Sequence, residues 1–347
     1  MDLAGQGCHG VTSGMPITLV WRTDVHLSDH SPRSRTDNWT DTVLNKLIAV
    51  GQIAKDVGAD AVIDGGDFFD LKSPTRNSHS LIRRVMEVHR DHYHCPVYAN
   101  VGNHDCVYGD YSYLPQQPLG VLYEAGTFKR LYDNHEAVFV DNPRRKLPPP
   151  TKVRVVGVPY HGVQYDMGRL ASITRGDEDY LVVAAHLLAS PTHSTMFDSE
   201  DVIRYDMLDQ YPDVDCWLFG HWHKDQGITN TPNGTPVVNI GSLTRGALSQ
   251  DNLDRVPSVG ILTFDSDGMH VTRKAVPHRP ASEVFDLMAK DKDDLQQTMI
   301  EEFVDHLSQT LVTDRQKSLG DIVREATGIP DRVRERALAY IEGSGGR

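Results

Sequence analysis

A short apolar stretch followed by polar side chains and an amphipathic helix recurs along the first third of the chain. The apolar stretches cover residues 16–21, 60–63 and 95–101, and helical periodicity covers 39–57 and 80–92. A helix that follows each strand returns the chain to the start of the sheet, so the pattern predicts a parallel sheet in an α/β fold. The carboxyl ends of parallel strands meet at one edge, and the polar residues are predicted to gather there.

The residues after these strands are of types that a hydrophobic core does not accommodate. Asp24 and His26 stand two positions apart, so they project from the same side of an extended segment. Asp67 follows a Gly-Gly pair that lets the backbone turn tightly. The third strand leads into Gly-Asn-His-Asp at residues 102–105. Alone, such a turn is typical of an ordinary surface loop, so only the whole set of motifs indicates a functional site.

Two later apolar stretches also end in histidine. Residues 180–186 end at His186, and residues 215–220 are followed by His221 and His223. Packing alone does not explain two buried strands that each end in imidazole. Further strands are predicted at 136–140 and 152–159, and antiparallel strands completing a second sheet are predicted at 236–240, 259–264 and 270–276.

The composition indicates a folded protein with a large core. Of the 347 residues 39% are hydrophobic, and 35 Lys and Arg against 48 Asp and Glu give a net charge of −13. This is the wrong sign for holding nucleic acid by bulk electrostatics. No apolar run is long enough for a membrane span, no secretory signal is visible, and the four cysteines are scattered, so we expect a cytoplasmic protein.

The chain is predicted to have one main domain and a small helical appendage. Charged, helically spaced segments at 281–311 and 318–342 either pack on the main domain or dock a partner. The expected divisions are a disordered leader at 1–14, a catalytic domain at 15–277, the appendage at 278–342 and a disordered tail at 343–347.

The polar residues at the strand ends form a donor set of oxygen and nitrogen atoms. Its members are Asp24, His26, Asp67, Asn103, His104, His186, His221 and His223. Such donors suit divalent manganese, iron or zinc, and the set is too large for one ion. Two adjacent ions that share a bridging carboxylate would generate hydroxide and stabilise the attacking and leaving oxygens at phosphorus. The predicted reaction is therefore phosphoester hydrolysis.

These motifs, in this order, resemble the calcineurin-like metallophosphoesterase superfamily. The residues that carry the resemblance are Asp24-Val-His26, Gly66-Asp67, Gly102-Asn103-His104-Asp105, His186 and Gly220-His221-Trp222-His223. The resemblance covers about residues 17–276 and implies a four-layer αββα sandwich.

The resemblance also implies a role for each of these residues. Asp24, His26 and His223 would hold one ion. Asn103, His186 and His221 would hold the other, and Asp67 would bridge. A metal-bridging hydroxide would attack the phosphodiester, His104 would assist the leaving group, and Asp105 would orient the far nitrogen of His104.

Within the superfamily, residues 66–70, 77–81 and 114–120 are most similar to SbcD-like DNA repair exonucleases, including phage recombination nucleases. This implies a manganese-dependent DNA nuclease, with iron or zinc as alternative metals. It also implies an SMC-like coiled-coil ATPase docked on the C-terminal helices, and a homodimer is a further expectation. The usual DNA-capping domain would be reduced or missing. The cations expected near the phosphate backbone, with solvated surface as the alternative, are Arg33, Arg35, Lys72, Arg76 and Arg245.

Two other functions fit the same residues. The first is a phosphatase or cyclic-nucleotide phosphodiesterase with the same metal centre. The second is a catalytically silent scaffold or binding module. The presence of His104 and Asp105 argues against the scaffold, because a silent protein needs no proton donor beyond the ligands.

Overall fold

The computed structural model describes residues 16–71, 77–106, 110–133, 135–140, 151–192, 200–265 and 267–288, with a few more between 323 and 338. The chain divides into one unit at Met1–Phe285 and another at Asp286–Arg347. The first unit therefore extends past the domain end predicted at residue 277. The predicted leader, the predicted tail and most of the predicted appendage lie outside the described residues.

The first sheet has six strands in the order β14-β13-β1-β2-β3-β4. Their bounds are β1 Ile17–Arg22, β2 Ala61–Asp64, β3 Val97–Ala99, β4 Lys129–Arg130, β13 Ser258–Asp265 and β14 Gly268–Ala275. Strands β1, β2 and β3 are parallel neighbours, as predicted, and β4, which was not predicted as a strand, continues the parallel order. The assignment of β13 and β14 to the second sheet was wrong, because β13 pairs antiparallel with β1 from Ile17↔Phe264 to Trp21↔Gly260.

The second sheet also has six strands, in the order β11-β12-β10-β7-β6-β5. Their bounds are β5 Glu136–Val140, β6 Lys152–Val158, β7 Tyr180–His186, β10 Cys216–Gly220, β11 Asp225–Asn230 and β12 Pro236–Ile240. The four inner strands are parallel, and β5 and β11 pair antiparallel at the edges. A separate pair joins β8 Ala189–Ser190 and β9 Ile203–Arg204. His186 ends β7, and His221 directly follows its neighbour β10.

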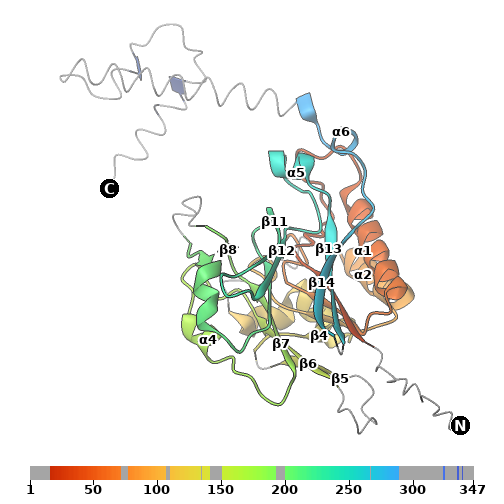
Figure 1. Cartoon of the computed structure of the whole chain (residues 1–347). Helices are drawn as coiled ribbons and strands as arrows, with labels where there is room; N and C mark the ends of the chain where they lie inside the picture. The colour runs from red at the N-terminus through yellow and green to blue at the C-terminus, as the bar shows by residue number, and fades with distance from the viewer. Residues whose placement is uncertain are drawn as a thin grey trace, which may run out of the picture. The chain divides into compact units, whose positions relative to one another are not determined.

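Helices cover the outer faces of the two sheets, as Figure 1 shows for α1 and α2 on one side and α4 on the other. The helices are α1 Trp39–Asp56, α2 His79–His92, α3 Pro118–Glu124, α4 Met167–Ala171, α5 Gln250–Asp254 and α6 Ala281–Val284, with 3-10 helices η3 Tyr111–Gln116 and η4 Tyr205–Gln210. Strand β1 shows the layering, because Leu19 and Trp21 pack between the sheets while Val20 packs toward α1 and α2. A third apolar cluster lies on the far side of the second sheet. The four-layer αββα arrangement is confirmed.

A buried ion pair joins β1 to β2 directly below the predicted site. Arg22 and Asp64 are register partners on these strands, and Arg22 Nε lies 2.6 Å from Asp64 Oδ2 with both side chains 0% exposed. The guanidinium also donates to Tyr93 Oη at 2.6 Å and lies over the ring of Phe68. The other carboxylate oxygen accepts from the amide of Gly66 at 3.2 Å, which links the pair to the turn that carries Asp67.

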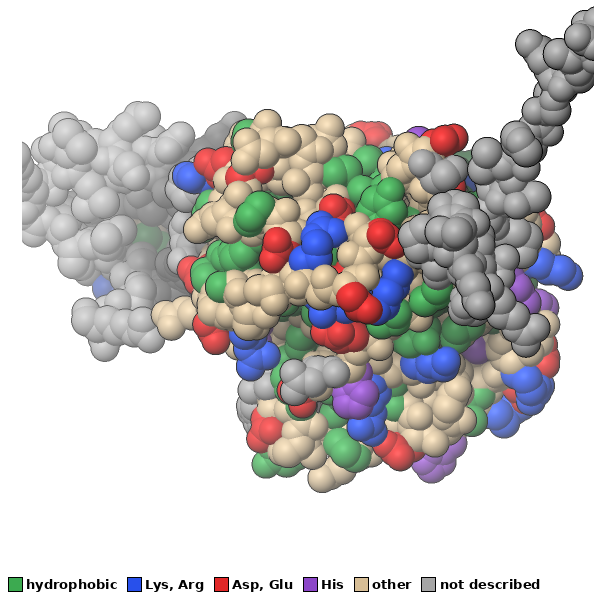
Figure 2. Space-filling view, turned by 60° about the horizontal axis from the view of Figure 1, so that its bottom comes forward, with side chains coloured by type: hydrophobic (Ala, Val, Ile, Leu, Met, Phe, Trp, Pro, Cys, Tyr) green, Lys and Arg blue, Asp and Glu red, His purple; other side chains and the backbone are tan. Residues whose placement is uncertain are grey.

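The surface carries charges of both signs. On the face drawn in Figure 2, Lys and Arg side chains alternate with Asp and Glu side chains, without a continuous basic surface among the residues described there. Within the described part of the chain, none of the helices has the length and apolar character that a membrane crossing requires.

Replacing Asp64 with Ala should lower the free energy of unfolding by about 3–5 kcal/mol, because Arg22 would stay buried without its counter-charge. Urea denaturation of the two proteins measures the difference. The matched control is Arg83→Ala, which breaks the exposed pair between Arg83 and Glu87 and should cost less than about 1 kcal/mol. Equal losses in the two variants would show that the buried pair is not a special constraint.

Candidate metal centre

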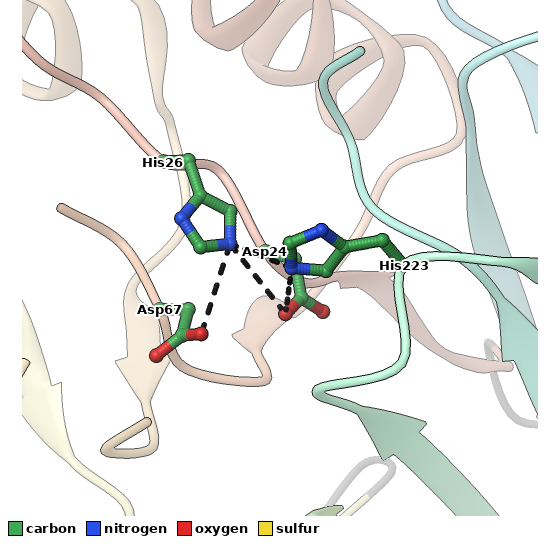
Figure 3. A group of neighbouring side chains, drawn as sticks. All are labelled: Asp24, His26, Asp67 and His223. Atoms are coloured by element: carbon green, nitrogen blue, oxygen red, sulfur yellow. Dashed lines mark hydrogen bonds and ion pairs between the residues drawn. The ribbon is translucent and has the colours of Figure 1, made fainter. Parts of the chain in front are cut away.

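The ends of β1, β2 and β10 bring four predicted ligands together. One potential ligand atom from each of Asp24, His26, Asp67 and His223 lies within 4.8 Å of the others. The imidazoles of His26 and His223 approach to 2.8 Å between their Nε2 atoms, and His223 Nε2 lies 3.5 Å from Asp24 Oδ1. Figure 3 shows these side chains pointing toward a common point, with Asp67 at the side facing His26.

A second group forms on the other side of Asp67. One atom each from Asp67, His186 and His221 lies within 4.8 Å of the other two. Asp67 Oδ2 is 3.3 Å from His186 Nε2, and Asn103 Oδ1 lies 3.3 Å from the same nitrogen. Asp67 Oδ2 is also 3.7 Å from His26 Nε2 in the first group. Asp67 therefore stands between the two groups, where a bridging carboxylate was predicted.

The donor sets of both groups fit divalent cations. Ligand atoms bound to one ion at about 2.0–2.2 Å lie roughly 3–3.5 Å from one another, close to the separations found here. His186 Nδ1 lies 2.9 Å from the carbonyl oxygen of Gly65, so it donates its proton there and turns the lone pair of Nε2 toward the centre. That lone pair faces oxygens of Asp67 and Asn103. Such a convergence of electron pairs requires a proton or a metal ion.

Strained backbone marks the same residues. Asp24, His26, Asp67 and His221 have positive φ angles of 54°, 49°, 53° and 88°. Residues other than glycine rarely adopt this backbone conformation, which costs about 1–3 kcal/mol at each position. Asp133 is the one other such residue among the described non-glycine residues. Strain of this kind is typical of functional sites, and it supports a function for these four residues independently of their chemistry.

Two glycines are required by close approach. A Cβ atom at Gly102 would lie 2.0 Å from Asp67 Oδ1, inside any allowed contact. A Cβ atom at Gly220 would lie 2.2 Å from Thr23 Oγ1, which donates to Asp24 Oδ2 at 2.6 Å. The predicted motifs therefore need glycine because the ends of neighbouring strands pack directly against the ligands.

Opposite charges at the centre shift the pKa values of its carboxyl and imidazole groups. Burial would raise the pKa of Asp67, but the imidazole of His186 outweighs burial and holds that pKa well below its usual range. Burial would lower the pKa of His186, but the carboxylate of Asp67 raises it to about 9. Burial would raise the pKa of Asp24, yet the imidazole of His223 keeps it low. The carboxylates are thus anionic, and in the absence of metal they draw protons onto neighbouring imidazoles.

His104 lies beside the first group with its ring fixed by the protein. Its ring centroid is 4.8 Å from that of His26, and its amide donates to Asp67 Oδ1 at 2.8 Å. Its Nδ1 donates to the carbonyl oxygen of Asp70 at 2.7 Å, so Nε2 is the nitrogen available for proton transfer.

The predicted role of Asp105 as the partner of His104 is corrected by this geometry. The carboxylate of Asp105 is buried and accepts from the amides of Phe68 at 3.1 Å and Gly102 at 3.0 Å. It therefore ties the turn after β2 to the turn after β3. Burial, together with the charge of Asp67, raises the pKa of Asp105 to about 8.

Three residues near the centre were not predicted as functional. Asp70 Oδ1 lies 3.4 Å from His26 Nδ1, Glu200 Oε1 lies 2.9 Å from His221 Nε2, and the ring centroid of Tyr160 lies 5.2 Å from that of His221. Asp70 adjoins a recognised motif, and Tyr160 follows strand β6, so their positions in sequence offered some signal. Glu200 lies in no motif, and only the fold brings it to the site.

The predicted cations have different environments. Arg33 is exposed, while Lys72 and Arg76 lie outside the described residues. The side chain of Arg35 is 3% exposed and pairs with Asp37 at 2.7 Å. Arg245 is 4% exposed and donates to the carbonyl oxygen of Arg279 at 2.5 Å. The expectation that Arg35 and Arg245 lie free for a phosphate is therefore corrected, because both guanidinium groups are used inside the protein.

Comparison with known proteins gives both a family and a distant relative. The family model for calcineurin-like phosphoesterases matches residues 18–225. The DNA double-strand break repair protein Mre11 of Methanosarcina acetivorans is 24% identical over 272 residues, which cover 76% of this chain. The chain spans about two fifths of that protein, at 39% of its length.

Similar solved structures include three phosphoesterases. The dimetal phosphatase of Danio rerio matches at 12% identity and a TM-score of 0.47, covering 75% of this chain and 99% of that one. The calcineurin-like phosphoesterase YfkN of Bacillus subtilis matches at 14% identity and a TM-score of 0.46, covering 83% of this chain and 98% of that one. The 5'-nucleotidase precursor of Thermus thermophilus matches at 16% identity and a TM-score of 0.44, covering 82% of this chain and 59% of that one.

Metal binding near pH 7 should release protons. The pKa of His186 is raised to about 9 in the metal-free protein, so the imidazole is protonated at neutral pH and must lose that proton to act as a ligand. The apparent affinity should therefore rise with pH until this proton is gone. Calorimetric titration of manganese in two buffers of different ionisation enthalpy should show release of about one proton or more. Identical heats in both buffers would contradict the assignment of His186.

Proposed function

We propose that this chain, which belongs to the calcineurin-like phosphoesterase family, is a two-metal phosphodiesterase acting on DNA. One observation carries the proposal: two groups of ligand atoms share the carboxylate of Asp67. A single oxygen of Asp67 lies 3.7 Å from His26 Nε2 and 3.3 Å from His186 Nε2. Paired divalent ions around a shared carboxylate are the typical arrangement for hydrolysis at phosphorus.

The residues divide between the two ions as follows: Asp24, His26 and His223 would hold the first, Asn103, His186 and His221 the second, and Asp67 both. When bound, the ions would activate water at neutral pH and stabilise negative charge on the phosphate oxygens. Oxygen and imidazole donors suit manganese, which we propose as the metal, with iron or zinc as alternatives.

His104 is the proposed proton donor to the leaving oxygen. The carbonyl of Asp70 holds its Nδ1 proton, which leaves Nε2 to carry the transferred proton. Its backbone amide donates a hydrogen bond to Asp67 Oδ1, which fixes the distance between His104 and the shared carboxylate. With its backbone anchored to Asp67 and its ring anchored at Nδ1, His104 can donate without first searching for its orientation, and such positioning accelerates general acid catalysis.

DNA is the proposed substrate because of the likeness to Mre11, which is named as a DNA double-strand break repair protein. The match covers 39% of that protein, so the activities of the whole relative come to this chain only as proposals. Cytoplasmic DNA repair or recombination, an SMC-like ATPase bound to the C-terminal helices, and a homodimer belong to the same proposal. Arg33, Lys72 and Arg76 remain the proposed contacts to the DNA backbone.

The proposal is tested with the full chain, loaded with manganese and incubated with single-stranded and double-stranded DNA, with and without a coiled-coil ATPase. Release of nucleotides or shorter fragments is the expected result, and a chelator should abolish it. Intact DNA together with cleavage of a small phosphomonoester or a cyclic nucleotide would instead favour a phosphatase or cyclic-nucleotide phosphodiesterase. Bound metal without hydrolysis of any phosphoester would favour the silent scaffold.

The His104→Ala variant should lose about 10²–10⁴-fold in kcat, because the leaving oxygen would depart without a proton donor. Its manganese content, measured by mass spectrometry of the purified protein, should stay at the wild-type value. The matched control is Asp67→Ala, which should lose both ions because each group depends on the shared carboxylate. Loss of metal from His104→Ala would show that His104 is a ligand instead.

A further inference from the structure

A carboxylate outside the predicted ligand set holds the ring of His221. Glu200 Oε1 lies 2.9 Å from His221 Nε2, and the side chains of Glu200 and His221 are 14% and 12% exposed. A carboxylate only accepts hydrogen bonds, so Nε2 of His221 carries the proton of this contact. The other ring nitrogen, Nδ1, then carries the lone pair of His221, which belongs to the group with Asp67 and His186.

Glu200 is itself fixed by a chain of hydrogen bonds that returns to the centre. Tyr165 Oη donates to Glu200 Oε1 at 2.7 Å. The amide of Leu188 in turn donates to Tyr165 Oη at 2.8 Å, and Leu188 stands two residues after His186. The carboxylate of Glu200 therefore cannot move without disturbing the segment that carries the other histidine of the same group.

The backbone of His221 is anchored separately from its ring. Its amide donates to Asp24 Oδ1 at 3.1 Å, and its φ angle of 88° turns the side chain out of the line of β10. The ring of Tyr160 packs against the imidazole at 5.2 Å between centroids. Asp24 thus fixes the backbone of His221, while Glu200 fixes the rotation of its ring.

We propose that Glu200 is a positioning residue for the second metal ion, acting through His221. It selects the His221 tautomer with the proton on Nε2 and directs the Nδ1 lone pair at the ion. His186 is oriented in the opposite sense, because its Nδ1 is bonded to Gly65 and its Nε2 faces the centre. Glu200 stands outside the group of Asp67, His186 and His221, so it supports a ligand and does not replace one.

The carboxylate contributes more than orientation. A histidine that donates to a carboxylate is a stronger metal ligand than one that donates to a neutral carbonyl, because the negative charge raises the basicity of the ring. The outer partner of a ligating histidine typically accounts for about 10- to 100-fold in metal affinity. The second ion, which lacks the carboxylate of Asp24, gains this support through Glu200.

The inference rests on the proposed two-metal function, and metal binding tests it without any assay of hydrolysis. Metal-stripped full chain is titrated with manganese for the wild type and for Glu200→Ala, Glu200→Gln and Tyr165→Phe. Glu200→Ala should weaken one of the two ions by about 10- to 100-fold and leave the other unchanged. Glu200→Gln keeps an oxygen acceptor but loses the charge, and Tyr165→Phe frees the carboxylate, so both should show smaller losses at the same ion.

Electron paramagnetic resonance gives a signature that a purely structural role would not change. Two neighbouring manganese ions couple magnetically, and in Glu200→Ala the coupled signal should require a higher manganese concentration than in the wild type. The matched control is Glu124→Ala, which removes an exposed glutamate paired with Arg130 and should bind both ions as the wild type does.

Unchanged affinity for both ions in Glu200→Ala would overturn the inference. So would equal weakening of both ions in Glu200→Ala and Glu200→Gln together with lower melting temperatures, because that pattern indicates general loss of structure. A wild type that binds two ions but leaves DNA intact would contradict the proposed function alone. A wild type that binds fewer than two ions would contradict both proposals.

Discussion

The ion pair between Arg22 and Asp64 is the constraint on which the arrangement of the site depends. The two residues are opposite each other on adjacent parallel strands with no exposure to solvent, so sliding one strand past the other would leave two buried charges unpaired. The register of β1 and β2 is fixed in this way immediately before the chain leaves the sheet. Asp24 and Asp67 follow within three residues of the ends of these two strands, so both lie at the same edge of the sheet. The carboxylate of Asp105 then joins the turn of β2 to that of β3, which extends the same alignment to Asn103 and His104.

Much of the centre could be predicted from the sequence because ligands at strand ends stand out against apolar neighbours. The hydrophobic periodicity of β13 fits either sheet, so it could not predict which one this strand joins. Pairing of β13 with β1 depends on contacts between segments far apart in the chain. Burial of Arg35 depends on Trp39 and Phe285, and the latter is far away in sequence. Glu200 and the true partner of His104 were missed for a similar reason. A hydrogen bond to a backbone carbonyl such as that of Asp70 leaves no mark on residue types.

The acidic composition is compatible with an acidic substrate if attraction comes from the centre and not from the surface. The described face in Figure 2 mixes both signs of charge, and the chain as a whole is at −13. Two divalent ions would bring four positive charges, and the carboxylates of Asp24 and Asp67 would cancel only two of them. The loaded site would therefore be locally positive. A phosphate would then be drawn to the place where it reacts. Such attraction is short in range, because salt screens charges beyond about 8–10 Å.

The absence of a side chain at Gly102 has a consequence for how related sequences should be interpreted. The Cβ of any other residue there would occupy the space of Asp67 Oδ1, so the position is constrained by its neighbour's volume and not by its own backbone angles. A homologue that retains every candidate ligand but carries alanine or serine at this place would have to displace the carboxylate that corresponds to Asp67. An inventory of ligands would count that homologue as intact. Inspection of this one glycine would identify it as a candidate pseudoenzyme.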